Sequence, residues 1–193
     1  MDRRWLLGGI LLASGFGFIR AVTARPKLEK DSRLLLIGDS LSQGMLPHFR
    51  VFAEEAGVPY IGSGIPGTRI DQWAASNWLE KTLAEFKPTH VLVSLGTNDA
   101  YSNLSPQSVQ QSAKTLIEKI QLAGAHVIWI GAPALPETYG KNILHEDTLQ
   151  VVQGVAPYYF ASQEYSIPRG PDNLHPSVQG YAGWAGAIWN WLT

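Results

Sequence analysis

Short apolar runs recur along the chain and end in glycine or polar residues. Residues 34–37 (LLLI) and 127–130 (VIWI) are uninterrupted, and a glycine follows each of them. Runs of this length are typical of strands that are buried on both faces of a sheet. The pattern predicts five strands, at residues 34–37, 58–61, 91–95, 127–130 and 158–160.

Stretches with apolar residues at helical spacing separate these strands. Ser105 is a suitable N-cap, and Pro106 suits the first helical position of one such stretch. Strands that alternate with helices indicate an α/β fold, with a parallel sheet covered on both faces and right-handed crossovers. The predicted helices are residues 43–56, 70–86, 106–123, 142–152 and 176–191.

The first 24 residues have the composition of an export signal. Arg3 and Arg4 precede an apolar run at residues 5–19, and small or compact side chains follow at residues 22–24. This order predicts a signal peptide cleaved after Ala24, and therefore a periplasmic or secreted protein. The alternative is an uncleaved N-terminal membrane anchor, although a bilayer span needs roughly 20 apolar residues.

The remaining chain is predicted to form one domain with few classes of partner. Residues 25–33 are polar and charged and are predicted to be a linker to a domain at residues 34–193. The net charge of the chain is -1, so no basic surplus points to nucleic acid. The chain has no cysteine, which excludes disulfides, a catalytic thiol and cysteine-ligated zinc.

Glycine or polar residues follow each of the first four predicted strands. The segments are residues 38–40, 62–68 and 96–99 and the stretch from Gly131 onward. In open α/β sheets, ligands bind at the edge formed by the carboxyl ends of the strands. We therefore expect a functional site where these segments converge.

Ser40 follows the first strand, in the sequence Gly38-Asp39-Ser40-Leu41-Ser42. A turn from a strand into a helix can hold a serine hydroxyl at the rim of the sheet. The same turn aims backbone N–H groups at a developing oxyanion. The alternative is a structural role, because serine and aspartate are common helix N-caps. On this motif alone, capping is the stronger interpretation.

His175 has the sequence context of a general base. It lies in a loop before the last helix, three residues after Asp172. An aspartate at that distance can fix the imidazole tautomer and stabilise the imidazolium, although such pairs also occur by chance. The other histidines are interpreted as structural or solvent-exposed: His48, His90, His126 and His145.

Two further segments offer donors to an oxyanion. Asn98, in Gly96-Thr97-Asn98-Asp99, can donate from its amide. Loss of one such donor typically costs about 2.7 to 4 kcal/mol of transition-state stabilisation. The glycines of residues 62–68 let N–H groups approach a ligand closely. The structural alternatives are an Asx turn at residues 98–99 and a simple loop at residues 62–68.

In their order along the chain, these segments resemble the sequence blocks of the SGNH hydrolases, also called the GDSL family of lipases and esterases. Residues 38–42 match the first block, residues 96–99 the third and residues 172–176 the last. The second block is best matched at Gly67, and Gly64 is the other candidate. The acidic residue that usually follows the glycine is missing.

The resemblance implies a flavodoxin-like three-layer sandwich with a parallel, roughly five-stranded sheet. It assigns the nucleophile to Ser40, the general base to His175 and the acid to Asp172. The oxyanion hole would consist of the N–H groups of Ser40 and Gly67 and the amide of Asn98. No cofactor and no metal are implied. An α/β-hydrolase fold is a weaker match, because no G-x-S-x-G elbow surrounds Ser40.

The expected activity is hydrolysis of small acyl esters, including O-acetyl groups on carbohydrate. Residues 101–104, residues 133–139 and Trp73 are candidates for the pocket lining. An acyltransferase would use the same triad, and a catalytically silent binding module could have the same fold. A flavodoxin-like nucleotide-binding protein is less favoured, because the chain has neither a P-loop nor a G-x-G-x-x-G motif.

Overall fold

The computed structural model describes residues 25–134 and 143–193. The predicted signal peptide or anchor at residues 1–24 lies outside these ranges, as does the 135–139 part of the expected pocket lining. In the described part of the chain, no helix is both long and apolar enough to cross a membrane.

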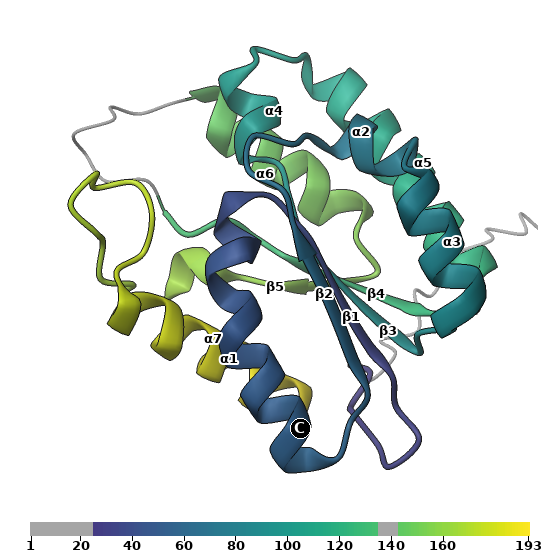
Figure 1. Cartoon of the computed structure of the whole chain (residues 1–193). Coiled ribbons are helices and arrows are strands. Elements are labelled where there is room, and N and C mark those ends of the chain that lie inside the picture. Colours follow the sequence, from purple (N-terminus) through teal and green to yellow (C-terminus); the bar gives the residue numbers. More distant parts are fainter. Residues whose placement is uncertain (1–24, 135–142) are drawn as a thin grey trace, which may run out of the picture.

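The core of the fold is a parallel sheet of five strands, in the order β2-β1-β3-β4-β5 (Figure 1). The predicted α/β class and the five-stranded parallel sheet are confirmed. The carboxyl ends of all strands point the same way, so the segments that follow them meet at one edge. The strands are β1 Leu34–Gly38, β2 Tyr60–Gly64, β3 His90–Ser94, β4 His126–Ile130 and β5 Tyr158–Phe160.

Helices cover both faces of the sheet and complete three layers (Figure 1). Helices α1 and α7 pack on one face, and α2, α3, α5 and α6 lie on the other. The helices are α1 Ser40–Ala56, α2 Ile70–Ala74, α3 Asn77–Phe86, α4 Thr97–Tyr101, α5 Pro106–Leu122, α6 Ile143–Val155 and α7 Val178–Leu192.

Alternate residues of each central strand supply the two hydrophobic cores. In β1, Leu35 and Ile37 face the core beneath α2, α3 and α5, whereas Leu34 and Leu36 face the core beneath α1 and α7. The same alternation holds in β3 and β4. Side chains of successive strand residues point to opposite faces, which explains why buried parallel strands have continuous apolar sequences.

Two of the predicted elements differ from the structure for identifiable local reasons. The second strand is Tyr60–Gly64 and not residues 58–61, because the N–H of Val58 donates to the carbonyl of Ala53 and closes α1. The predicted helix at residues 70–86 is two helices, because the Ser76 hydroxyl accepts from the N–H of Leu79 and starts α3.

Residues 25–33, predicted as a linker, contact the domain. The N–H of Leu28 donates to the carbonyl of Leu192, and Lys27 Nζ donates to the carbonyl of Thr193. Arg33 Nε donates to the carbonyl of Lys87. The segment therefore lies beside the amino ends of the strands, at the edge opposite to Ser40.

Candidate active site

The carboxyl ends of β1 and β3 place Ser40 and Asn98 at the same edge of the sheet. Ser40 is the first residue of α1, directly after β1. The N-cap is Asp39, whose Oδ1 accepts from the N–H of Leu41 at 2.9 Å. Since Asp39 caps the helix, the Ser40 hydroxyl is not used for capping.

The side chains of Ser40, His175 and Asp172 form a continuous chain of hydrogen bonds. Ser40 Oγ lies 2.9 Å from His175 Nε2, and His175 Nδ1 lies 2.6 Å from Asp172 Oδ2. A carboxylate beside Nδ1 requires that this nitrogen carry the proton. Nε2 therefore presents a lone pair to the serine hydroxyl. The three residues that the sequence predicted are thus brought into bonding reach of one another.

Asp172 is held as a carboxylate by its hydrogen bonds. Its Oδ1 accepts from the N–H groups of Leu174 and His175 at 3.0 and 2.9 Å. The hydrogen bond from the His175 ring, followed by these backbone bonds, lowers the pKa of Asp172 to about 2. Asp172 is therefore ionised at neutral pH and can stabilise a positive charge on the imidazole.

The loop that carries Asp172 and His175 closes on itself at its base. An isolated antiparallel bridge pairs Arg169 with Pro176, and the N–H of Gly170 donates to the carbonyl of His175 at 2.7 Å. The Arg169 guanidinium donates to the carbonyls of Leu174 and Ala134. These bonds tie the loop to the segment that follows β4.

The amide of Asn98 connects the segments that follow β1 and β2. Its Nδ2 donates to Asp39 Oδ2 at 3.1 Å and to the carbonyl of Thr68 at 3.0 Å. Asn98 is half-buried at the start of α4, a short helix that the sequence pattern did not predict. The amide nitrogen is thus aimed toward the same edge of the sheet as Ser40.

The two candidate glycines lie in different surroundings. Gly64 ends β2, and a Cβ there would lie 2.5 Å from the Gln43 backbone nitrogen, so its absence lets β2 approach α1 closely. Gly67 lies in the exposed turn beyond β2 with φ +77, a conformation that favours glycine. Among the described residues, nothing accepts a hydrogen bond from the Gly67 N–H.

Two buried carboxylates beneath the site were not predicted as functional residues. Asp39 is 1% exposed and Asp99 is 0% exposed. Burial raises the pKa of Asp39 to about 7 and the pKa of Asp99 to about 6. Asp99 accepts from the N–H of Ile70 with both oxygens at 3.3 Å. The position of Asp39 beside Ser40 could have identified it from the sequence. It was missed because an aspartate there is fully explained as a helix N-cap.

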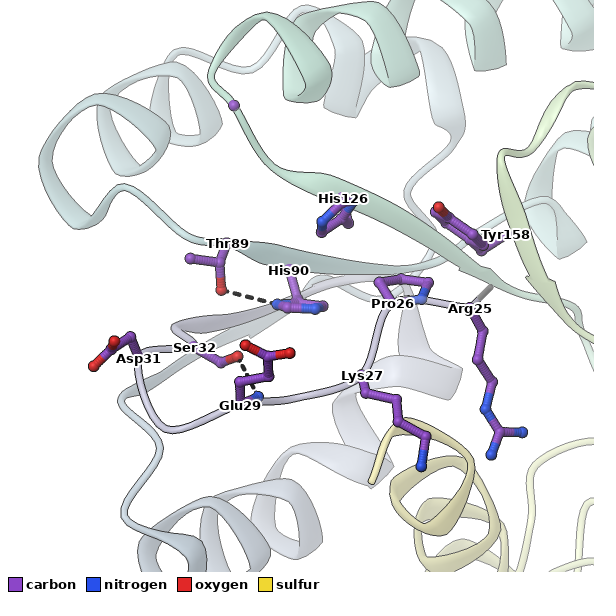
Figure 2. Close-up of a pocket in the computed structure, with 11 residues that line it drawn as sticks. Arg25, Pro26, Lys27, Glu29, Asp31, Ser32, Thr89, His90, His126 and Tyr158 are labelled. Carbon is purple, nitrogen blue, oxygen red and sulfur yellow. Dashed lines mark hydrogen bonds between the residues drawn. The ribbon is translucent and has the colours of Figure 1, made fainter. Parts of the chain in front are cut away.

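The opposite edge of the sheet contains a separate pocket of about 610 Å³ (Figure 2). His90 is buried there and His126 is exposed, with ring centroids 5.3 Å apart. His90 Nδ1 lies 2.8 Å from the hydroxyl of Thr89 (Figure 2). Burial lowers the pKa of His90 to about 4. In residues 25–134 and 143–193, no group of three His, Asp or Glu side chains is arranged to hold a metal ion.

The proposed pocket lining is only partly supported. Trp73 is 2% exposed in the hydrophobic core, and its Nε1 donates to the Thr68 hydroxyl at 2.9 Å. It cannot contact substrate there, so this prediction is wrong. Tyr101 is 44% exposed at the end of α4, whereas Leu104 packs partly buried against the core. Trp73 therefore does not line the site.

Two curated proteins are similar to this chain in sequence. The chain is 31% identical over 121 residues to the esterase TesA of Pseudomonas aeruginosa, covering 58% of this chain and 59% of that protein. It is 29% identical over 149 residues to thioesterase 1/protease 1/lysophospholipase L1 of Escherichia coli, covering 72% and 65%. The chain thus spans about three fifths of the length of these curated relatives.

A solved structure and a family profile extend the comparison over most of the chain. The acetylxylan esterase Axe2 of Geobacillus stearothermophilus shares the fold, with a TM-score of 0.69, 17% identity and coverage of 86% of this chain and 96% of that one. The profile of the GDSL-like lipase/acylhydrolase family matches residues 36–182. By this match, the chain belongs to the GDSL-like lipase/acylhydrolase family.

Proposed function

We propose that the chain is a serine esterase that hydrolyses small acyl esters through Ser40, His175 and Asp172. The observation that carries this proposal is the hydrogen-bond chain from the Ser40 hydroxyl through the imidazole to the carboxylate, at 2.9 and 2.6 Å. A serine hydroxyl becomes a useful nucleophile when a base stands at this distance and a third group orients the base. Membership of a family of lipases and acylhydrolases supports the same chemistry.

The reaction would proceed in two steps. Ser40 Oγ attacks the ester carbonyl, and His175 Nε2 accepts its proton. The tetrahedral intermediate then expels the alcohol, which takes the proton from His175, and an acyl-Ser40 ester remains. Water attacks this ester with His175 again as base, and the acid is released as Ser40 recovers its proton. Asp172 stays ionised throughout and stabilises the imidazolium.

The negative charge on the carbonyl oxygen would be held by three donors. These are the N–H groups of Ser40 and Gly67 and the amide of Asn98. The Gly67 N–H is preferred over that of Gly64, because Gly64 is packed against α1 whereas the Gly67 turn is exposed. Such donors act in the transition state, where the oxygen carries charge.

The proposed substrate is a short acyl group, such as acetyl, on a carbohydrate. The fold shared with an acetylxylan esterase supports this choice. The exposed side chains of Ile65 and Tyr101 lie in the segments after β2 and β3, the strands that flank β1. These two side chains are the proposed contacts of a small acyl chain.

An assay with chromogenic acetyl, butyryl and longer acyl esters tests the proposal. The wild type should turn over the short esters, and Ser40→Ala should lower kcat by at least about a thousandfold, as loss of a triad nucleophile does. Equal turnover by both proteins would remove Ser40 from the mechanism. A sugar acceptor added to the assay distinguishes hydrolysis from transfer, which would give an acylated sugar.

We also propose that the enzyme acts outside the cytoplasm. The support is the order of basic, apolar and small residues at positions 1–24. N-terminal sequencing of exported protein should start near Arg25. Recovery of the intact Met1 end from a membrane fraction would instead favour an uncleaved anchor.

A further inference from the structure

The amide nitrogen of Asn98 donates to two oxygen atoms. Its two N–H bonds point to Asp39 Oδ2 at 3.1 Å and to the carbonyl of Thr68 at 3.0 Å. A carbonyl and an ionised carboxylate cannot donate, so, with Asp39 ionised, the amide oxygen cannot take the place of the nitrogen without meeting two acceptors. The surroundings therefore select one of the two possible orientations of the Asn98 side chain.

Of these two acceptors, Asp39 is the more firmly held. Its Oδ1 accepts from the N–H of Leu41 at 2.9 Å, and its backbone carbonyl accepts from the Ser42 hydroxyl at 2.7 Å. The side chain is buried at the junction of β1 and α1. Thr68 lies in the partly exposed turn beyond β2. Asp39 is thus the fixed point against which the Asn98 amide is oriented.

Capping alone does not account for an aspartate at position 39. Asparagine and serine cap helices about as well as aspartate, and neither would bury a charge. Burial raises the pKa of Asp39 to about 7, which means that its ionised form is costly in this site. The property that aspartate has and asparagine lacks is two oxygens that both accept, one for Leu41 and one for Asn98.

We propose that Asp39 is a positioning residue that holds the amide nitrogen of Asn98 toward the oxyanion formed at Ser40. This inference rests on the proposed esterase function. In the reaction, the N–H now bonded to Thr68 would be shared with the substrate oxygen, while the bond to Asp39 keeps the amide in place. Asp39 itself does not contact the reacting atoms.

The variants Asp39→Asn and Asp39→Ser separate positioning from capping. In Asp39→Asn, the oxygen remains on Leu41 and an NH2 group faces Asn98. The Asn98 amide then turns over and presents its oxygen to the oxyanion. In Asp39→Ser, the cap is kept, but the short side chain does not reach Asn98. Positioning therefore predicts a larger loss in Asp39→Asn than in Asp39→Ser, whereas a purely capping residue predicts activity near wild type in both.

The experiment measures kcat and KM for a chromogenic acetyl ester in these variants, in Asn98→Ala and in the double variant Asp39→Asn/Asn98→Ala. Asp39→Asn should lower kcat about a hundredfold, the size of one lost oxyanion donor, with little change in KM. The double variant should be no slower than Asn98→Ala, because both changes remove the same interaction. Asp99→Asn is the matched control, since it removes a neighbouring buried carboxylate that bonds Ile70 and not Asn98.

Three results would overturn the inference. These are a kcat for Asp39→Asn within about threefold of wild type, a loss no larger than that of Asp39→Ser, and losses that multiply in the double variant. Thermal unfolding of each variant shows whether it is folded. If Asp39→Asn does not fold, the kcat of Asp39→Ser still tests the inference. If Ser40→Ala is inactive while Asp39→Asn is active, this inference fails alone. If Ser40→Ala is active, the proposed function fails.

Discussion

Each edge of the sheet holds a histidine beside a hydroxyl group, but the two histidines differ in exposure and in their other neighbours. At the carboxyl edge, His175 is partly exposed on a loop, between an ionised carboxylate at 2.6 Å and a serine hydroxyl at 2.9 Å. At the amino edge, His90 is buried, and its Nδ1 lies beside the hydroxyl of Thr89 (Figure 2). The first ring can gain a proton in a reaction, whereas burial opposes charge on the second.

The difference follows from what each edge of a parallel sheet provides. Turns at the carboxyl ends lead into helix N-termini, so Ser40 and Asn98 meet near free N–H groups. The amino ends of β3 and β4 instead follow the C-termini of α3 and α5, where a helix presents carbonyl groups. The groups on either side of the ring therefore decide whether a histidine can act in catalysis. The presence of a nearby cavity does not.

At the carboxyl edge, a pH-dependent difference in stability is expected from Asp99. Its pKa is raised by burial from an ordinary 3.8 to about 6, so the folded protein holds a proton that the unfolded chain has released. The free energy of unfolding should therefore fall as pH rises from about 4 through 6. Asp99→Asn should remove this contribution to the pH dependence of unfolding. The variant should be about 2 kcal/mol more stable than wild type at pH 8.

Urea unfolding of wild type and Asp99→Asn at pH 4 and pH 8 measures the contribution of Asp99 to the free energy of unfolding. The two proteins should be equally stable at pH 4 and differ at pH 8. The carboxylates and cations that face Asp99 are Asp39, Asp71 and Arg69, and they are the same in both proteins. A difference that is the same at both pH values would contradict the account.

An effect of opposite sign is expected at His90. Its pKa is lowered by burial, and secondarily by His126, from 6.5 to about 4. The unfolded chain therefore binds a proton that the folded protein excludes, and stability should fall as pH drops from 6.5 toward 4. His90→Gln should flatten this acid decline, because glutamine takes up no proton in either state. An unchanged slope in the same unfolding series would show that His90 is readily protonated.

Sequence patterns predicted those parts of the fold that depend on local order and burial. Apolar runs identified the central strands, and parallel packing then required Ser40 and Asn98 to share an edge. The hydrogen bond between Asp39 and Asn98 joins residues 59 positions apart and depends on two side-chain rotamers, which no local pattern encodes. The break at Ser76 was missed because apolar spacing continues across it, although Ser76 itself is a good N-cap.

The most direct test of the central claim is covalent labelling by a phosphonate ester, followed by peptide mass analysis. One adduct is expected, on Ser40, formed rapidly in wild type and in His126→Gln and at least about a hundredfold more slowly in His175→Gln, which lacks the base. An adduct on another residue, or equal rates in the two histidine variants, would contradict the account.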